Sequence, residues 1–358
     1  MKNFMNFDMK VQSVFENGAD DFANFYSLMV DTARGTQKVS KQEANDKIRE
    51  IFCQIIGVNE HSSTKEVRQA IRRNQTLIYD LLEDVYADAL VSGWENNPFF
   101  EQFVETKNLA IGDRNEFYIP DNSVLNVMDV SGNSHDIWRQ KVSHGRTESL
   151  TTGWIAVKEF EDFERIVTGR ADFAALIAKV PEAINMYVRE AVYNTMSGYV
   201  SSLPAAFKAS GTLSADALRT LCETVSMATG KEVVIMGTRT ALRSITGLQN
   251  ASYISDTMKD EFNRTGLLGM WEGYQLLEIM QGFKKNDLSK YLVDNKTIYI
   301  MPVDAERPIK VVYEGDTIIT QSQDQAAKLD MSYEHEVATK LGVGIIWNYN
   351  FGAFVIEG

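Results

Sequence analysis

The chain has 358 residues, 44% of them hydrophobic, which is enough to form a substantial folded core. Its 49 acidic and 36 basic residues give a net charge of −13, which argues against the Lys- and Arg-rich surface of a nucleic-acid-binding protein. The cysteines Cys53 and Cys222 form no CxxC pair, and no run approaches the ~18 apolar residues of a membrane span. We therefore expect a cytoplasmic protein that is neither secreted nor embedded in a membrane.

The first hundred residues have the pattern of helices. Residues 40–56 are rich in charged helix formers and carry one narrow apolar face, and Gly57 is placed to end that helix. Ser63 followed by Glu66 has the spacing of a capping box, which predicts the start of another helix. The apolar faces of these helices must pack on the body of the same chain or on a neighbouring subunit.

Residues 111–152 have the pattern of an extended hairpin. Strand-like runs at residues 116–119 and 124–130 are followed by the turn at residues 131–133 and a polar return segment. A lone hairpin is marginally stable in water, so this one needs support from another chain. Aromatic and arginine side chains dominate interface energies. The predicted subunit-contact residues of the hairpin are Phe117, Tyr118, Trp138, Arg139 and Lys141. The alternative for Trp138 is that it packs within its own hairpin.

A strand and a long amphipathic helix follow the hairpin. Residues 154–157 are strand-like and lead through an acidic bend into apolar positions spaced for one helix face. These positions are Phe173, Leu176, Ile177, Val180, Ile184, Val188, Ala191 and Val192. Pro181 removes a helical hydrogen bond at a cost of about 3 kcal/mol, which predicts a kink or a short restart of the helix.

The remaining sequence predicts a mixed α+β body. Helices are expected at residues 215–228, 239–248 and 253–263. Short buried strands are expected at residues 233–236, 274–279, 297–301, 309–313, 345–347 and 354–356, the last two joined by a short loop. Helices and strands that alternate irregularly favour the α+β class.

The sequence offers no convincing catalytic, cofactor or metal site. His135 and His144 lie in a polar, turn-rich segment without further ligands, and are expected to be exposed loop histidines. His335 lacks the second histidine of an HExxH motif. Gly342 and Gly344 lead into a strand, whereas dinucleotide binding needs a helix N-terminus. The acidic bend at residues 159–164 is expected to be a solvated face.

Taken in order, these elements resemble the major capsid proteins of tailed bacteriophages, which have the HK97-like fold. The resemblance covers roughly residues 110–358 and is carried by WIAVKEFEDFERIVTGRADFAALIAKVPEAINMYVREAV, VVIMGTRTALRSI, GLLGMWEGYQLLEI and IYIMPVDAERPIKVVYEGD. It implies an extended hairpin (E-loop), a long spine helix, and peripheral and axial domains. We accordingly expect a helical N-terminal arm at 1–110, the E-loop at 111–152, the peripheral domain at 153–210 and 297–340, and the axial domain at 211–296 and 341–358.

The resemblance implies a structural protein and no enzyme. Such a protein assembles with itself into the hexamers and pentamers of an icosahedral head around double-stranded DNA, without sequence-specific binding and without a membrane. Scaffolding, portal and decoration proteins are expected partners. The expected location is the virion, assembled in the cytoplasm of the host bacterium. The alternatives are an encapsulin-like nanocompartment shell, against which the long helical N-terminus argues, and a soluble α+β enzyme.

Overall fold

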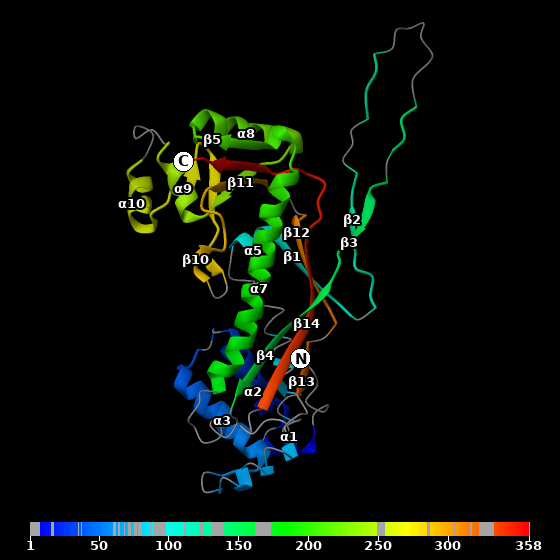
Figure 1. Cartoon of the computed structure of the whole chain (residues 1–358), viewed down its shortest axis with the longest axis vertical. Helices are drawn as coiled ribbons and strands as arrows, with labels where there is room; N and C mark the ends of the chain where they lie inside the picture. Colours follow the sequence, from blue (N-terminus) through cyan, green and yellow to red (C-terminus); the bar gives the residue numbers. More distant parts are fainter. Residues whose placement is uncertain are drawn as a thin grey trace.

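The computed structural model describes most of the chain between residues 8 and 357. The stretches not described are residues 16–17, 35, 37, 60–61, 64, 68, 71–72, 75–76, 78–80, 83, 86–87, 89–97, 111, 122–124, 130–138, 143, 162–172, 249–254, 285–286, 304–305, 316 and 322–332. The molecule is elongated, with a helical group at one end, a sheet at the other and one long helix joining them (Figure 1).

Short helices form the N-terminal end, as the sequence predicted. They are α1 (Met9–Val14), α2 (Ala19–Arg34) and α3 (Lys41–Ile56), whereas the helix α5 (Pro98–Phe103) lies nearer the middle of the molecule (Figure 1). Ser40 caps α3 in a capping box with Glu43, and Gly57 ends the helix with a left-handed φ of 78°. The predicted box at Ser63 is also present, since the Ser63 N–H donates to Glu66 Oε2 at 2.8 Å.

These helices pack on the body of their own chain. α2 and α3 lie against the end of the long helix α7 (Phe173–Ser202) that is farthest from the sheet at the opposite end of the molecule (Figure 1). Met29 of α2 and Ile48 of α3 are fully buried in the same apolar cluster as Ile184 and Val188 of α7. Of the two alternatives left by the sequence, the structure therefore has the intrachain one.

The long helix is the central element of the fold. Val180, Ile184, Val188 and Val192 are at most 2% exposed and form one buried face at a spacing of four residues. The helix runs through Pro181 without interruption, as one helical axis, so of the two predicted alternatives, a kink or a short restart, the restart does not occur. Packing of the apolar face on both sides of Pro181 compensates for the lost backbone hydrogen bond.

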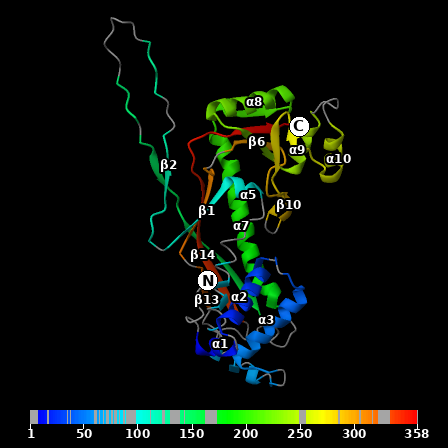
Figure 2. The same cartoon turned by 180° about the vertical axis from the view of Figure 1, so that it is seen from behind.

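A five-stranded sheet lies beside the middle of the molecule (Figure 2). Its strands are β1 (Val104–Leu109), β4 (Gly153–Glu161), β12 (Ile309–Glu314), β13 (Ile318–Gln321) and β14 (Tyr333–Ile345). β14 is the long central strand, because it pairs antiparallel with β12, β13 and β4. β1 joins the edge in parallel with β12, so the segment just before the hairpin already belongs to this sheet.

A six-stranded sheet forms the opposite end of the molecule, in the order β5-β15-β11-β6-β8-β7. The strands are β5 (Lys208–Gly211), β6 (Val233–Gly237), β7 (Met270–Trp271), β8 (Tyr274–Glu278), β11 (Thr297–Pro302) and β15 (Gly352–Ile356). Alternate residues of the central strands enter two different clusters. Met236 and Tyr299 join the cluster of α7, whereas Ile235 and Ile298 join that of α8 (Ala215–Thr229) and α9 (Arg239–Thr246). α10 (Asp256–Thr265) and η2 (Ala205–Phe207) complete this end.

Strand pairing differs from the predicted division of the chain in three places. β11 was assigned to the peripheral part, but it lies between β6 and β15 in the six-stranded sheet. β5 likewise pairs with β15. Residues 341–345 were assigned to the axial part, but they pair with β12 in the five-stranded sheet. The predicted strand at residues 354–356 is confirmed within β15, whereas β14 ends at Ile345, and the loop between them leads from one sheet into the other.

Candidate assembly interface

A long hairpin projects from the body of the molecule (Figure 1). Its base is a two-stranded ladder of β2 (Glu116–Ile119) and β3 (Arg146–Ser149). Farther out, Gln140 holds the two segments together by accepting from the Asn126 N–H and donating to the Asn126 carbonyl, both at 2.7 Å. The predicted strand at residues 124–130 is wrong for residues 125–129, which the structure describes as irregular. The predicted extended hairpin itself is confirmed.

The described outer part of the hairpin exposes large apolar side chains. The exposed fractions are 51% for Leu125, 97% for Val127 and 61% for Val142. Contiguous exposed apolar surface on a soluble chain marks a contact with another molecule. None of these three residues was among the predicted contact residues, which were aromatic and charged.

Gly145 lies at the junction between the outer part of the hairpin and the two-stranded ladder at its base. Its φ is 74°, in the left-handed region that favours glycine. A Cβ at this position would lie 2.4 Å from the Ile119 carbonyl oxygen and 2.9 Å from the Tyr118 hydroxyl. The Tyr118 hydroxyl donates to the neighbouring His144 carbonyl at 2.7 Å, which ties the two segments across this turn.

The predicted contact residues separate into two groups. Tyr118, Arg139 and Lys141 are exposed on the hairpin, where another chain can reach them. Phe117 is only 8% exposed and packs within its own chain, which leaves little of its side chain for the predicted contact with a neighbour. The period of two in a strand explains this difference, because adjacent residues of β2 point to opposite faces. Trp138 lies outside the described residues.

Phe117 fixes the root of the hairpin to the five-stranded sheet. It clusters with Ile119 and Leu150 of the hairpin region and with Leu109, Val312 and Ile346 of the body. Lys107 and Lys310 place their Nζ atoms 5.0 Å and 5.5 Å from the centre of the Phe117 ring, within range for cation–π attraction. Lys310 is also paired with Glu105, which lies opposite it in the register of β1 and β12.

A second polar cluster holds the returning chain at the root. Glu314 at the end of β12 binds Lys340 Nζ at 2.7 Å and accepts a hydrogen bond from the Thr152 hydroxyl just before β4. The Lys340 side chain, and then Thr152, lower the pKa of Glu314 below its usual value of 4.5. Both partners favour the ionised carboxylate, so their stabilisation depends on its charge.

Replacement of Glu314 by glutamine is expected to lower the thermal midpoint above about pH 5 and to lower it progressively less as the pH falls below that value. A carboxyl whose pKa is lowered in the folded state stabilises it above the unfolded pKa, and this stabilisation is lost as pH falls through the folded value. Thermal unfolding of Glu314→Gln and the parent chain between pH 7 and pH 3 tests the expectation. A difference that stays constant over this range would contradict it.

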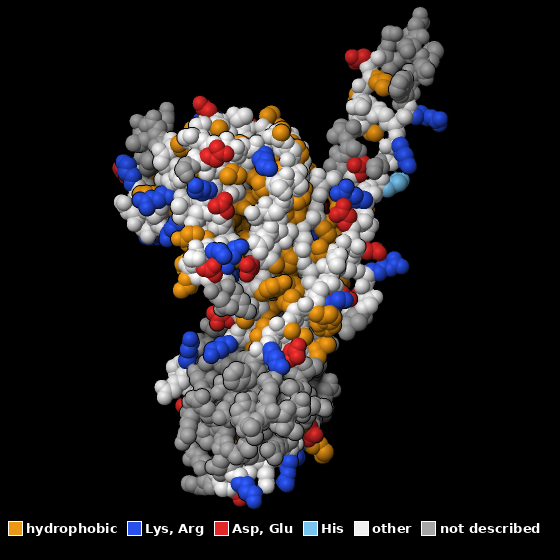
Figure 3. All heavy atoms as spheres, in the orientation of Figure 1, with side chains coloured by type: hydrophobic (Ala, Val, Ile, Leu, Met, Phe, Trp, Pro, Cys, Tyr) orange, Lys and Arg blue, Asp and Glu red, His pale blue; other side chains and the backbone are white. Residues whose placement is uncertain are grey.

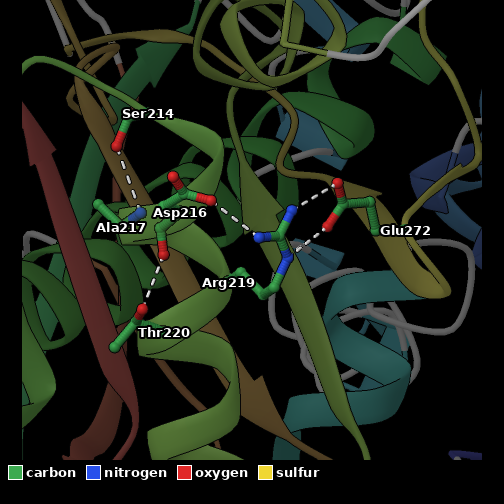
Figure 4. Close-up of polar contacts among 6 residues, drawn as sticks. All are labelled: Ser214, Asp216, Ala217, Arg219, Thr220 and Glu272. Carbon is green, nitrogen blue, oxygen red and sulfur yellow. Dashed lines mark hydrogen bonds and ion pairs between the residues drawn. The ribbon is translucent and has the colours of Figure 1, made fainter.

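The far end of the six-stranded sheet is held by an arginine bridge (Figure 4). Arg219 of α8 binds Glu272 in the β7–β8 turn through Nε and Nη2, both at 2.9 Å, and binds Asp216 through Nη1 at 2.9 Å. Hydrogen bonding to Glu272 raises the pKa of Arg219. Both side chains are partly exposed and screened by water, so the bridge positions the turn and adds little to stability.

Other expected features have mixed outcomes. His144 is exposed, as predicted, whereas His135 lies outside the described residues. Gly342 and Gly344 lie inside β14, in agreement with the prediction that they belong to a strand. Over the part of the chain that the structure describes, no group of three or more His, Cys, Asp or Glu side chains is placed to hold a metal ion. In the same residues, no helix combines the length and apolar character needed to cross a bilayer.

The architecture resembles several solved shells at low sequence identity. The mature capsid of bacteriophage PhiM1 matches with 12% identity and a TM-score of 0.48, over 73% of this chain and 88% of that one. The procapsid of satellite phage P4 with its size determination (Sid) protein matches with 8% identity and a TM-score of 0.48, over 78% and 91%. The holo-SrpI encapsulin complex of Synechococcus elongatus matches with 10% identity and a TM-score of 0.40, over 71% and 84%.

The family assignment rests on a match of the sequence itself. No curated protein matches the chain. The model of one protein family matches residues 24–355, which include most of α2, all of α3, the hairpin and most of both sheets. That family is described as "SPbeta prophage-derived putative capsid protein YonB". The chain therefore belongs to the YonB family of prophage-derived capsid proteins, has an α+β fold, and is a structural protein of the capsid shell.

Proposed function

We propose that the chain is a major capsid protein that assembles with itself into the hexamers and pentamers of an icosahedral phage head enclosing double-stranded DNA. The observation that carries this proposal is the projecting hairpin, whose described outer part leaves Leu125, Val127 and Val142 exposed. A hairpin of this length is not stable on its own in water, so a neighbouring subunit is its natural support. Repeated contacts of this head-to-tail kind close identical subunits into rings.

The net negative charge of the chain supports the proposal that the shell encloses DNA without binding it tightly. A net charge of −13 repels phosphate at long range and removes the counterion-release term that drives nucleic-acid binding. Scaffolding, portal and decoration proteins are the further partners that this function requires. Assembly takes place in the cytoplasm of the host bacterium, and the assembled protein resides in the virion.

Expression of the chain, alone and together with its neighbouring genes, tests the proposal. We expect uniform round shells, or rings of five and six subunits, in negative-stain electron microscopy. Nuclease-protected double-stranded DNA inside the shells of an infected host supports a phage head, whereas protein cargo would identify a nanocompartment. A chain that stays monomeric with all its neighbouring genes present, and whose thermal midpoint rises with a common metabolite, would favour an enzyme instead.

Replacement of Val127 by aspartate is expected to lower the yield of assembled particles at least about tenfold and to leave the subunit folded. Val127 is 97% exposed, so the change costs little in the isolated chain, but a charge would be buried without a partner in the assembled shell. Sedimentation measures the yield and circular dichroism measures the fold. Trp138→Ala is expected to act in the same direction.

The matched control is Met227→Asp on α8, since Met227 is 76% exposed and lies on the body of the molecule. It introduces the same charge away from the hairpin and is expected to assemble normally. Equal yields from Val127→Asp and the parent chain would remove the hairpin from the contact surface.

A further inference from the structure

Among the described residues outside the hairpin, a small flap on the six-stranded end carries four large exposed apolar side chains within one short segment. We define the flap as residues 280–284 and 287–291, which include the antiparallel pair β9 (Phe283–Lys284) and β10 (Asp287–Tyr291). Its exposed fractions are 62% for Met280, 48% for Phe283, 80% for Leu288 and 53% for Tyr291. The rings of Phe283 and Tyr291 stack at a centroid distance of 5.6 Å. Aromatic residues and methionine in one exposed patch are typical of the core of a protein interface.

The flap is fixed to the body and does not depend on a partner for its position. The Gln281 side chain donates to the Val293 carbonyl at 2.8 Å and accepts from the Val293 N–H at 3.0 Å. Leu292 N–H donates to the Gly282 carbonyl at 2.8 Å. Ile279, at the entry to the flap, is fully buried. A patch held in this way loses little conformational entropy when it binds.

The flap and the hairpin lie on opposite sides of α7 in both views of the fold (Figures 1 and 2). In the space-filling view, apolar side chains gather mainly along the middle of the molecule, with smaller groups on the side where β10 lies (Figure 3). A head-to-tail contact between identical subunits needs two different patches that face in different directions. The flap therefore has the position required to receive the hairpin of the next copy.

The chemistry of the two surfaces is complementary. The outgoing segment of the hairpin, residues 125–129, combines exposed apolar residues with the exposed carboxylate of Asp129. The flap combines its apolar patch with Lys284 and Lys290, the latter beside Asp287 at 3.1 Å. A cavity of about 580 Å³ lies between the flap and α7. Its lining includes Tyr193, Asn194, Ser197, Lys284, Lys290 and Tyr291.

We infer that the flap is the surface on which one subunit receives the hairpin segment 125–129 of a second copy of the same chain. A nucleic acid would use the lysines of the flap but would leave Met280 and Leu288 exposed, so a protein partner fits the patch better. The inference rests on the proposed function and adds to it the identity of the receiving surface.

The first test compares the assembly of three single variants. Leu288→Asp is expected to lower the particle yield at least about tenfold, with the thermal midpoint of the subunit unchanged. Lys284→Glu is expected to lower the yield less, and adding Asp129→Lys to it is expected to restore part of that loss. Met227→Asp is the control for a charge placed elsewhere on the same end of the molecule. If Leu288→Asp forms shells with the same yield as the parent chain, the inference is overturned and the proposed function stays intact.

The second test asks directly which surfaces meet. A chain with Val127→Cys and Leu288→Cys is expected to form disulfide-linked dimers and larger ladders under oxidising conditions, whereas each single variant is not. Shells that form without these crosslinks would overturn the assigned receiver and leave the proposed function intact. If the parent chain forms neither shells nor capsomers with its neighbouring genes, the proposed function and this inference fail together.

Discussion

Replacing Met29 by alanine is expected to lower the free energy of unfolding of the unassembled subunit by about 2–5 kcal/mol. Met29 lies in α2 and is 0% exposed, in the same apolar cluster as Val180, Ile184 and Val188 of α7. Truncation removes its apolar contacts and leaves a cavity between the two helices, and a packed interior closes such a cavity only partly. Urea unfolding of the subunit, kept below the concentration at which it assembles, measures the loss.

The control is Asn24→Ala, an exposed position on the same helix, which is expected to change the free energy of unfolding by less than about 0.5 kcal/mol. The experiment separates two roles of the N-terminal helices. If α2 were an arm that packs on a neighbour, Met29→Ala would weaken assembly and leave the isolated subunit unchanged. The intrachain packing instead predicts that the helices form a permanent part of the subunit, because their removal would expose the buried face of α7.

The sequence predicted individual elements well where local chemistry determines them. The capping box at Ser63, the left-handed stop at Gly57 and the buried face of α7 all follow from residues within one or two turns of each other. The α+β class and the extended hairpin also followed from such local patterns. Local patterns did not predict that the helix continues unbroken through Pro181, because the packing that holds it there is a tertiary effect.

Pairing between distant segments was the part that the sequence could not supply. The buried run of β11 has the same local pattern in either sheet, and only its partners β6 and β15 place it in the six-stranded one. The difference in burial between Phe117 and Tyr118 has the same origin. Both are aromatic residues of one short strand, and the body of the molecule decides which of them is buried. The flap was missed because its four apolar side chains are scattered over a polar segment.

Replacement of Phe117 by alanine is expected to loosen the root of the hairpin while the body of the subunit stays folded. Phe117 is the aromatic residue of the small cluster that joins the hairpin to β1 and β12, and Lys107 and Lys310 lie over its ring. Loss of a buried phenylalanine costs about 3–5 kcal/mol where the surrounding structure cannot yield. The hairpin can yield, because beyond this root its described contacts are a short ladder and a few hydrogen bonds. We therefore expect local opening in place of global unfolding.

Hydrogen exchange of the unassembled subunit distinguishes these outcomes. In Phe117→Ala, the amides of β2 and β3 are expected to exchange at least about tenfold faster, since about 1.4 kcal/mol of lost local stability corresponds to that factor, and the thermal midpoint of the body is expected to change little. Phe117→Leu keeps the apolar contact and loses the cation–π attraction, so its effect is expected to be smaller. Tyr118→Phe is the control on the exposed face, since it removes only the hydroxyl bonded to the His144 carbonyl. Unchanged protection of β2 and β3 in Phe117→Ala would show that other contacts hold the hairpin. The angle between the hairpin and the body would then depend on the neighbouring subunit and not on the Phe117 cluster.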